Sequence, residues 1–150
     1  MLKVKDIMTK EIISVPPAME IVQAAKILLD KSINGVPVVD GGKLAGILCQ
    51  SDLIAQQEKL PIPSVFTLLD GIISLGSTKH FEKVLRKIAA TTVADAMTPD
   101  PVTVRPETGI DEVATLMLEK NFHTIPVVEE GRLVGIIGKE DILRAIVSKR

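Results

Sequence analysis

Apolar residues follow two kinds of pattern along this chain. In residues 36–39 and 44–48 they are nearly continuous, which is typical of strands buried on both faces. Between these runs, Asp-Gly-Gly at residues 40–42 predicts a tight hairpin turn, because glycine accepts positive φ. A helical spacing precedes the hairpin, at Ile21, Ala24, Ala25 and Leu28. The pattern therefore predicts a helix followed by a β-hairpin.

The same pattern returns later in the chain. Residues 4–54 align without a gap with residues 93–143, which indicates an internal repeat. Identical pairs include Asp6/Asp95, Met8/Met97, Thr9/Thr98, Pro37/Pro126, Gly46/Gly135 and Asp52/Asp141. We expect one module with repeat one at residues 2–57, an insert at 58–91 and repeat two at 92–150.

Each repeat is predicted to contain a strand, a helix, two strands and a helix. The first strand is expected at residues 12–15 or 102–104, and the last helix at 52–56 or 141–147. Thr108 and Asp111 fit a capping box at the first helix of repeat two. This order implies a right-handed parallel crossover, and the hairpin adds an antiparallel neighbour. Because helices cover only one face of each small sheet, we expect an α/β (α+β) fold with the repeats packed face to face about a pseudo-twofold axis.

The insert has helix-compatible spacing at residues 64–73 and an amphipathic pattern at 79–90. Three interpretations are open: it packs on its own module, it forms a surface for a second subunit or partner protein, or it lies on a membrane surface.

Composition argues against a nucleic-acid-binding, membrane-spanning or secreted protein. The 150 residues are 46% hydrophobic and 25% charged with a formal charge of −1, so no strong field for nucleic acid is expected. No apolar run approaches the roughly 20 residues that cross a bilayer, and the N-terminus lacks a signal-peptide core. With Cys49 as its one cysteine, the chain is expected to be cytoplasmic.

The sequence contains no recognisable catalytic or metal-binding motif. Its two histidines, His80 and His123, do not have metal-ligand spacing, and neither phosphate-binding glycine motif is present. We therefore expect no catalytic residue, no metal and no enzymatic activity.

The repeated motifs resemble a known family. Residues 6–9 and 95–98 (Asp-Ile-Met-Thr, Asp-Ala-Met-Thr), 35–40 and 124–129, and 46–52 and 135–141 are similar to the motifs of CBS domains, named for cystathionine β-synthase. The chain resembles a stand-alone tandem CBS pair. The resemblance implies a disc-like module that binds AMP, ADP, ATP or S-adenosylmethionine in clefts between its repeats. It also implies pairing as a homodimer and a role as an energy or metabolite sensor that acts on an unknown regulated protein.

Asp52 and Asp141 are the main candidate ligand residues. A carboxylate can accept hydrogen bonds from both hydroxyls of a ribose, which is the role that the resemblance implies. The alternative is an acidic residue that stabilises a helix N-terminus.

The position three residues before each aspartate differs from the family pattern. The resemblance implies a phosphate-contacting Thr or Ser there, but the chain has Cys49 and Gly138. Lys139 could supply charge to a phosphate, and Gln50 is its neutral counterpart. A buried packing role is the alternative for Cys49.

Further candidates flank these positions, and each also has a purely structural explanation. Ser14 and Thr103 offer hydroxyls on the first strands, or are polar edge positions. Val36-Pro37 and Ile125-Pro126 resemble an adenine-facing wall, or are ordinary core. His123 could contact a ligand, or is a solvated loop residue.

Two functions follow. The first is a regulatory module that senses an adenosine-containing ligand in clefts between the repeats. The alternative is a protein-interaction or dimerisation module whose insert docks a partner and whose pockets are vestigial.

Overall fold

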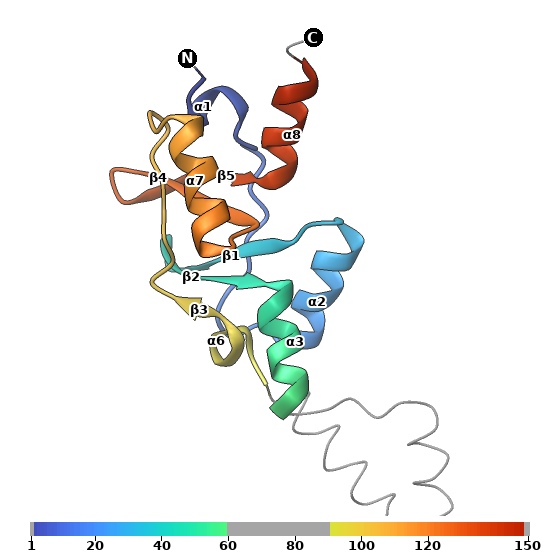
Figure 1. The fold of residues 1–150 in the computed structure, drawn as a ribbon. Coiled ribbons are helices and arrows are strands. Elements are labelled where there is room, and N and C mark those ends of the chain that lie inside the picture. The colour runs from blue at the N-terminus through green and yellow to red at the C-terminus, as the bar shows by residue number, and fades with distance from the viewer. Residues whose placement is uncertain (1, 60–90, 149–150) are drawn as a thin grey trace, which may run out of the picture.

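The structure is a computed structural model that describes residues 2–59 and 91–148. It has two halves of similar construction (Figure 1). The first half contains α2 (Ile21–Asp30), β1 (Gly35–Asp40), β2 (Lys43–Cys49) and α3 (Gln50–Lys59). The second contains α7 (Ile110–Lys120), β4 (Thr124–Glu129), β5 (Arg132–Gly138) and α8 (Lys139–Ser148). The predicted α/β fold is confirmed, whereas the helical patterns at 64–73 and 79–90 lie outside the described residues.

Both predicted hairpins are present. Strand β1 pairs antiparallel with β2, and β4 with β5. The first turn has two glycines in the left-handed region, Gly41 at φ 58° and Gly42 at φ 83°. The second turn has Glu130 at φ 51° in place of the first glycine. A side chain therefore occupies a conformation that costs an L-residue about 1–2 kcal/mol.

The first strand of each repeat is shorter than predicted. Only Val15 and Val104 form bridges, parallel to Val38 and Val127 respectively. The parallel direction is as expected, but the predicted strands at 12–15 and 102–104 are wrong in extent. The two segments end where predicted, at Val15 and Val104, but residues 12–14 and 102–103 before them form no bridge.

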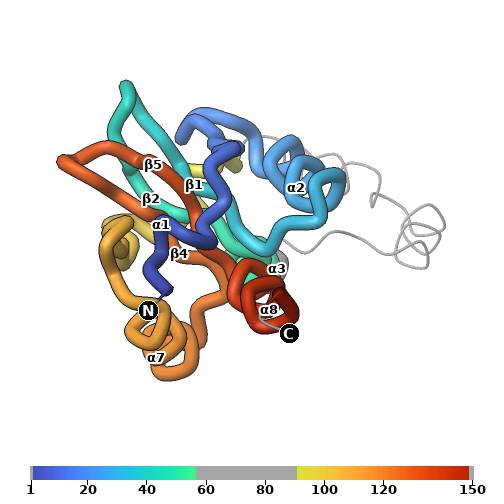
Figure 2. Tube along the Cα trace, turned by 90° about the horizontal axis from the view of Figure 1, so that it is seen from above, coloured from blue at the N-terminus to red at the C-terminus, as the bar shows by residue number. Residues whose placement is uncertain are grey.

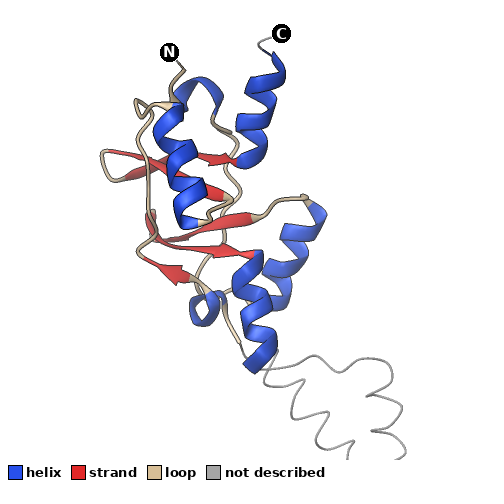
Figure 3. Ribbon diagram, in the orientation of Figure 1, coloured by secondary structure: helices blue, strands red, loops and turns tan. Residues whose placement is uncertain are grey.

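The two sheets lie next to each other in the middle of the molecule. Strand β1 contacts β4, and β2 contacts β5, while α2 and α3 lie on one side and α7 and α8 on the other (Figures 1 and 3). Each half has its own cluster of buried side chains, one around Val36, Val38 and Leu48, the other around Ile125, Val127 and Ile137. The expected face-to-face arrangement of the repeats is therefore confirmed.

The segment that opens each repeat packs against the other repeat. We call residues 3–9 and 92–98 the lead-in segments. They contain the short helices α1 (Val4–Ile7) and α6 (Val93–Ala96), and the second ends at the first residue of β3 (Thr98–Pro99). Val4 is fully buried in the core of repeat two, and Val93 in the core of repeat one. In Figure 2, α1 lies beside the elements of repeat two. The two repeats therefore exchange their first helices.

Backbone hydrogen bonds fix this exchange. Val4 N donates to Thr108 O at 2.8 Å, and Val93 N donates to Met19 O at 2.8 Å. Strand β3 adds to β2 of repeat one, and Thr9 forms a bridge to Ile136 of repeat two.

Aspartates cap the two lead-in helices. Lys3 N donates to Asp6 Oδ2 at 2.8 Å, and Thr92 N donates to Asp95 Oδ2 at 2.8 Å. These bonds explain the repeated aspartate of the motif, and the hydrogen bonds from Thr92 lower the pKa of Asp95.

The capping box predicted at Thr108 and Asp111 is wrong. Helix α7 begins at Ile110 with Gly109 as its N-cap and without a side-chain cap. The Thr108 hydroxyl instead accepts from Arg105 N at 3.0 Å, within the preceding turn.

An ion pair joins only one of the lead-in segments to its host repeat. Lys3 Nζ and Lys5 Nζ lie 2.7 and 2.8 Å from the two carboxylate oxygens of Glu107. These bonds lower the pKa of Glu107 to about 2 and raise the pKa of Lys5. The matching residues at the other lead-in segment are Thr92, Ala94 and Ala18, which cannot form this pair.

Candidate functional site

Among the described residues, two clefts between the repeats occupy positions related by the repeat. A third cavity of about 330 Å³ lies beside Asp141 and Arg144, next to Leu2 and to Asp6 and Ile7 of the first lead-in segment. We name each of the two clefts after its aspartate. The Asp141 cleft has a volume of about 140 Å³ and the Asp52 cleft about 310 Å³. Each is built from both repeats: the end of one hairpin and the helix that follows it, and the first extended segment after the lead-in of the other. The Asp141 cleft is lined by Thr9, Glu11, Ile13, Ser32, Asn34, Pro37, His123, Thr124, Ile136, Lys139, Glu140, Asp141 and Arg144, among others.

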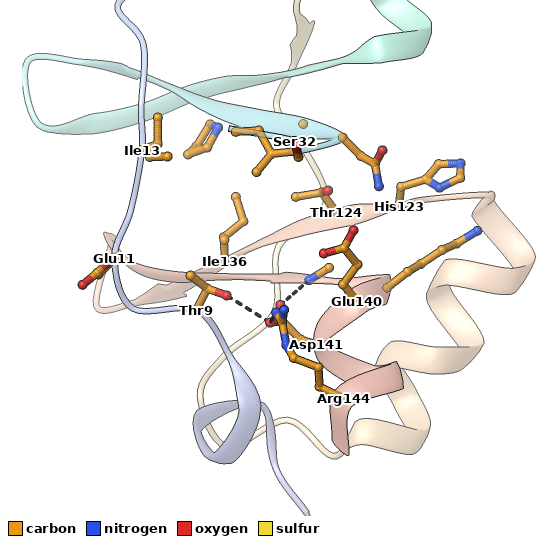
Figure 4. A pocket seen from close by; sticks show the side chains of 16 residues that line it. Thr9, Glu11, Ile13, Ser32, His123, Thr124, Ile136, Glu140, Asp141 and Arg144 are labelled. Atoms are coloured by element: carbon orange, nitrogen blue, oxygen red, sulfur yellow. Dashed lines mark hydrogen bonds and ion pairs between the residues drawn. The ribbon is translucent and has the colours of Figure 1, made fainter. Parts of the chain in front are cut away.

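Asp141 is the most enclosed charged group of its cleft. It is 6% exposed and accepts three hydrogen bonds (Figure 4). Its Oδ2 accepts from Gly138 N at 2.8 Å, and its Oδ1 accepts from Thr9 Oγ1 at 3.0 Å and from Arg144 Nη2 at 2.7 Å. Thr9 belongs to the first lead-in segment, so this contact joins the two repeats at the cleft.

Asp52 has the same arrangement without the arginine. Its Oδ2 accepts from Cys49 N at 2.8 Å, and its Oδ1 accepts from Thr98 Oγ1 at 3.2 Å. The residue that matches Arg144 is Ala55. The two clefts therefore share a carboxylate and a threonine, but among the side chains that the structure describes only Arg144, in the Asp141 cleft, places a cation on the carboxylate.

Both aspartates stabilise helix starts. Helices α3 and α8 begin two residues before the aspartates, earlier than predicted, and each carboxylate accepts the backbone N–H of the residue before the helix. The helix-capping interpretation is thus correct for both residues. Because each carboxylate also lines a cleft, capping leaves the ribose-binding prediction in place.

Three of the four candidate phosphate positions line a cleft. Gly138 and Lys139 line the Asp141 cleft, and Cys49 lines the Asp52 cleft. Gln50 is not among the residues that line the Asp52 cleft, and its Nε2 donates to Ile33 O at 3.3 Å. Burial, followed by the charge of Asp52, raises the pKa of Cys49 to about 11, so the thiol stays protonated near neutral pH.

The candidates on the first extended segments fall one residue from the clefts. Ser14 and Thr103 are exposed and line neither cleft, whereas Ile13 and Val102 line the Asp141 and Asp52 clefts respectively. Successive side chains of an extended segment point to opposite sides, which explains this offset.

The wall candidates show the same alternation. Val36 and Ile125 are buried in the two cores, at 0% and 1% exposure. Pro37 lines the Asp141 cleft and Pro126 the Asp52 cleft, so the prolines are the available wall residues.

His123 is exposed and lines both clefts. Its backbone oxygen accepts from Lys139 N at 3.0 Å, which ties the loop before β4 to the start of α8.

Sequence reasoning missed Thr9, Thr98 and Arg144 as site residues. The two threonines end the repeated Asp-x-Met-Thr motif, and this identity was the available signal. Arg144 lies one residue after the aligned region, and the matching residue of repeat one is Ala55. Only the structure shows that Arg144 contacts Asp141.

Within residues 2–59 and 91–148, no group of three or more His, Cys, Asp or Glu side chains could hold a metal ion. In the same ranges, every helix is too short or too polar to cross a membrane.

Comparison with known proteins identifies the family. The CBS domain family matches residues 4–59 and residues 93–148, and the chain therefore belongs to this family and carries two copies of the domain. CBSX2, a chloroplastic CBS domain-containing protein of Arabidopsis thaliana, is 32% identical over 135 residues; the match covers 87% of this chain and 57% of CBSX2. The Methanocaldococcus jannaschii protein MJ1426 is 29% identical, with 96% of this chain and 90% of that protein covered.

Solved structures agree with this placement. CBSX2 in complex with AMP matches with a TM-score of 0.75 and 30% identity, covering 100% of both chains. The CBS domain pair of MJ0100, in complex with 5′-methylthioadenosine and S-adenosyl-L-methionine, matches with a TM-score of 0.73 and 30% identity, covering 100% of this chain and 99% of that one.

Proposed function

We propose that the protein is a regulatory module that binds an adenosine-containing ligand in one or both clefts between its CBS repeats. The observation that carries this proposal is the pair of matching clefts, each with an aspartate next to a threonine of the opposite repeat. The relatives CBSX2 and MJ0100, crystallised with AMP and with two other adenosine compounds, support the ligand class. The candidate ligands are AMP, ADP, ATP and S-adenosylmethionine.

Each cleft has the chemistry that adenosine requires. A carboxylate can accept ribose hydroxyls, and a proline with an apolar neighbour can flank the base. In the Asp141 cleft these residues are Pro37 and Ile13, and in the Asp52 cleft Pro126 and Val102. Because every cleft contains parts of both repeats, a bound ligand would alter how the repeats sit against each other, which is a means of signalling to a regulated protein without catalysis.

Isothermal titration calorimetry with the four candidate ligands tests this proposal. We expect binding by at least one of them, and we expect Asp52→Asn or Asp141→Asn to weaken it while leaving the fold unchanged by circular dichroism. The amide oxygen of asparagine can still accept the capping N–H, so the matched pair separates ligand binding from helix capping. Heat release from none of the four ligands at millimolar concentration would contradict the proposal.

We also propose that the protein forms a homodimer through α8 and α3. Ile54 on α3 and Leu143 on α8 are matching positions of the two repeats, and both are exposed, at 69% and 59%. Ile146 and Val147 extend this apolar surface along α8. Light scattering after size exclusion should report a dimer that Leu143→Glu dissociates. Arg132→Glu, in the hairpin of repeat two, is the control and should leave the dimer intact.

The alternative function, docking of a partner protein by the insert, remains a prediction because residues 60–90 lie outside the described residues. Loss of a co-purifying protein with Phe66→Asp, but not with Asp52→Asn and Asp141→Asn together, would favour that alternative.

A further inference from the structure

The geometry points to Arg144 as the residue that sets which class of adenosine ligand the Asp141 cleft accepts. It blocks the carboxylate for an uncharged nucleoside and supplies a cation for a nucleotide phosphate. This inference rests on the proposed function and deepens it. It concerns a residue outside the repeated motifs, at a position where the two clefts differ.

The first step is the hydrogen-bonding capacity of the two carboxylates. A carboxylate has about four acceptor sites. Asp141 already accepts from Gly138, Thr9 and Arg144, whereas Asp52 accepts from Cys49 and Thr98 among the described residues. Two ribose hydroxyls fit the capacity that is left at Asp52. At Asp141 they exceed it, so Arg144 must leave before both hydroxyls can bind.

The second step is that Arg144 can leave. Its side chain is 66% exposed although its partner Asp141 is only 7% exposed, so the guanidinium covers the carboxylate from the solvent side. Figure 4 shows Arg144 lying against Asp141 at the base of the cleft. Arg144 lines the Asp141 cleft, of about 140 Å³, and also the cavity of about 330 Å³ beside it, so the side chain has space to move into on leaving Asp141.

The third step is the charge that a phosphate would meet. Besides Asp141, the Asp141 cleft is lined by Glu11 and Glu140 and by two cations, Lys139 and Arg144. With Arg144 displaced from Asp141 and kept in the cleft, two cations face a phosphate and offset the two exposed glutamates. Without Arg144, Lys139 alone would oppose both glutamates. A nucleotide that breaks the Arg144–Asp141 ion pair therefore gains a contact between Arg144 and its phosphate. A nucleoside breaks the same ion pair and gains no such contact.

The consequence is a change of opposite sign for two ligands. Arg144→Ala copies the Asp52 cleft. It should tighten binding of adenosine to the Asp141 cleft by about 3- to 10-fold, because one competing hydrogen bond is removed. The same change should weaken AMP by about 10-fold or more, because a charge-assisted contact to the phosphate is lost.

The experiment is calorimetric titration of adenosine and AMP into the full chain carrying Asp52→Asn, so that the Asp141 cleft is measured, with and without Arg144→Ala. Arg144→Met, which keeps the aliphatic stem, repeats the test if the alanine variant is unstable. Ala55→Arg in the Asp141→Asn background is the reciprocal variant and should shift the Asp52 cleft from adenosine towards AMP.

The outcomes separate the inference from the proposed function. Opposite shifts for adenosine and AMP support the inference. Equal shifts, no shift, or a silent Asp141 cleft in a chain that still binds through Asp52 overturns the inference and leaves the proposed function standing. Absence of binding to the unsubstituted chain overturns both.

Discussion

Gly46 and Gly135 are matching residues of the two repeats. Gly46 packs closely against Met97 and Thr98, and Gly135 against Met8 and Thr9. We predict that alanine is tolerated less well at the first than at the second. A methyl carbon at Gly46 would lie 2.7 Å from Met97 Sδ and 2.7 Å from the Thr98 carbonyl oxygen. At Gly135 it would lie 2.6 Å from Met8 Sδ but 3.2 Å from the Thr9 carbonyl oxygen.

The magnitude follows from which atoms can move. A methionine sulfur can rotate away, but a backbone carbonyl in a strand pair can move only with the strand, and Thr98 belongs to β3. Overpacking of this kind costs about 1–3 kcal/mol. We assign the upper part of that range to Gly46→Ala and the lower part to Gly135→Ala. For a chain of this size, the melting temperatures should fall by about 5–10 °C and about 2–4 °C respectively.

The assay is thermal and urea unfolding followed by circular dichroism, because the chain has no Trp or Tyr for fluorescence. Shortening the methionine supplies the control. Met8→Ala combined with Gly135→Ala should show a favourable coupling energy, whereas Met97→Ala combined with Gly46→Ala should recover little because the carbonyl contact remains. Equal losses at the two glycines, or a larger loss at Gly135, would refute the reasoning.

Three further predictions concern single side chains. Because the pKa of Cys49 is raised to about 11, its reaction with a maleimide at pH 7.5 should be slow in the folded chain and accelerate on unfolding; an equal rate in both states would contradict this. Glu107 has its pKa lowered to about 2, so its ion pair stabilises the fold above the unfolded pKa of 4.5 and loses that effect as pH falls through about 2. Glu107→Gln should therefore lower the melting temperature at pH 7 by an amount that shrinks between pH 4.5 and 2, and a constant difference across that range would be evidence against the ion pair. Glu130→Gly, which copies Gly41 of the first hairpin, should raise stability by about 0.5–1 kcal/mol in urea unfolding, whereas a loss would argue against the left-handed backbone at this turn.

The sequence was sufficient for the hairpins and the repeat because these depend on local rules. Asp-Gly-Gly between apolar runs specifies a turn, and an ungapped match specifies two copies of one fold. Patterning could not locate the ends of elements. The first strands shrink to single bridges at Val15 and Val104, and α7 lacks the side-chain cap that Thr108 and Asp111 suggested.

For the site, the motif located the aspartates together with Cys49, Gly138, Lys139, Pro37, Pro126 and His123, which line the clefts, but the residues expected on the first strands were displaced by one position. Ile13 and Val102, rather than Ser14 and Thr103, line the clefts, because the phase of an extended segment is fixed by packing on the other repeat. The contact of Arg144 with Asp141 could not be predicted, since a helical spacing of three residues alone does not show which oxygen a long side chain will meet.

Because the repeats exchange their first helices, a fragment that contains a single repeat should not form a complete core. A fragment that ends within the insert would keep α1 but lose α6, so its own hydrophobic interior would lie open where Val93 belongs. The complementary fragment would lack Val4 in the same way. The core of each repeat is therefore completed by a segment of the other repeat. We expect the two repeats to fold and unfold as one cooperative unit.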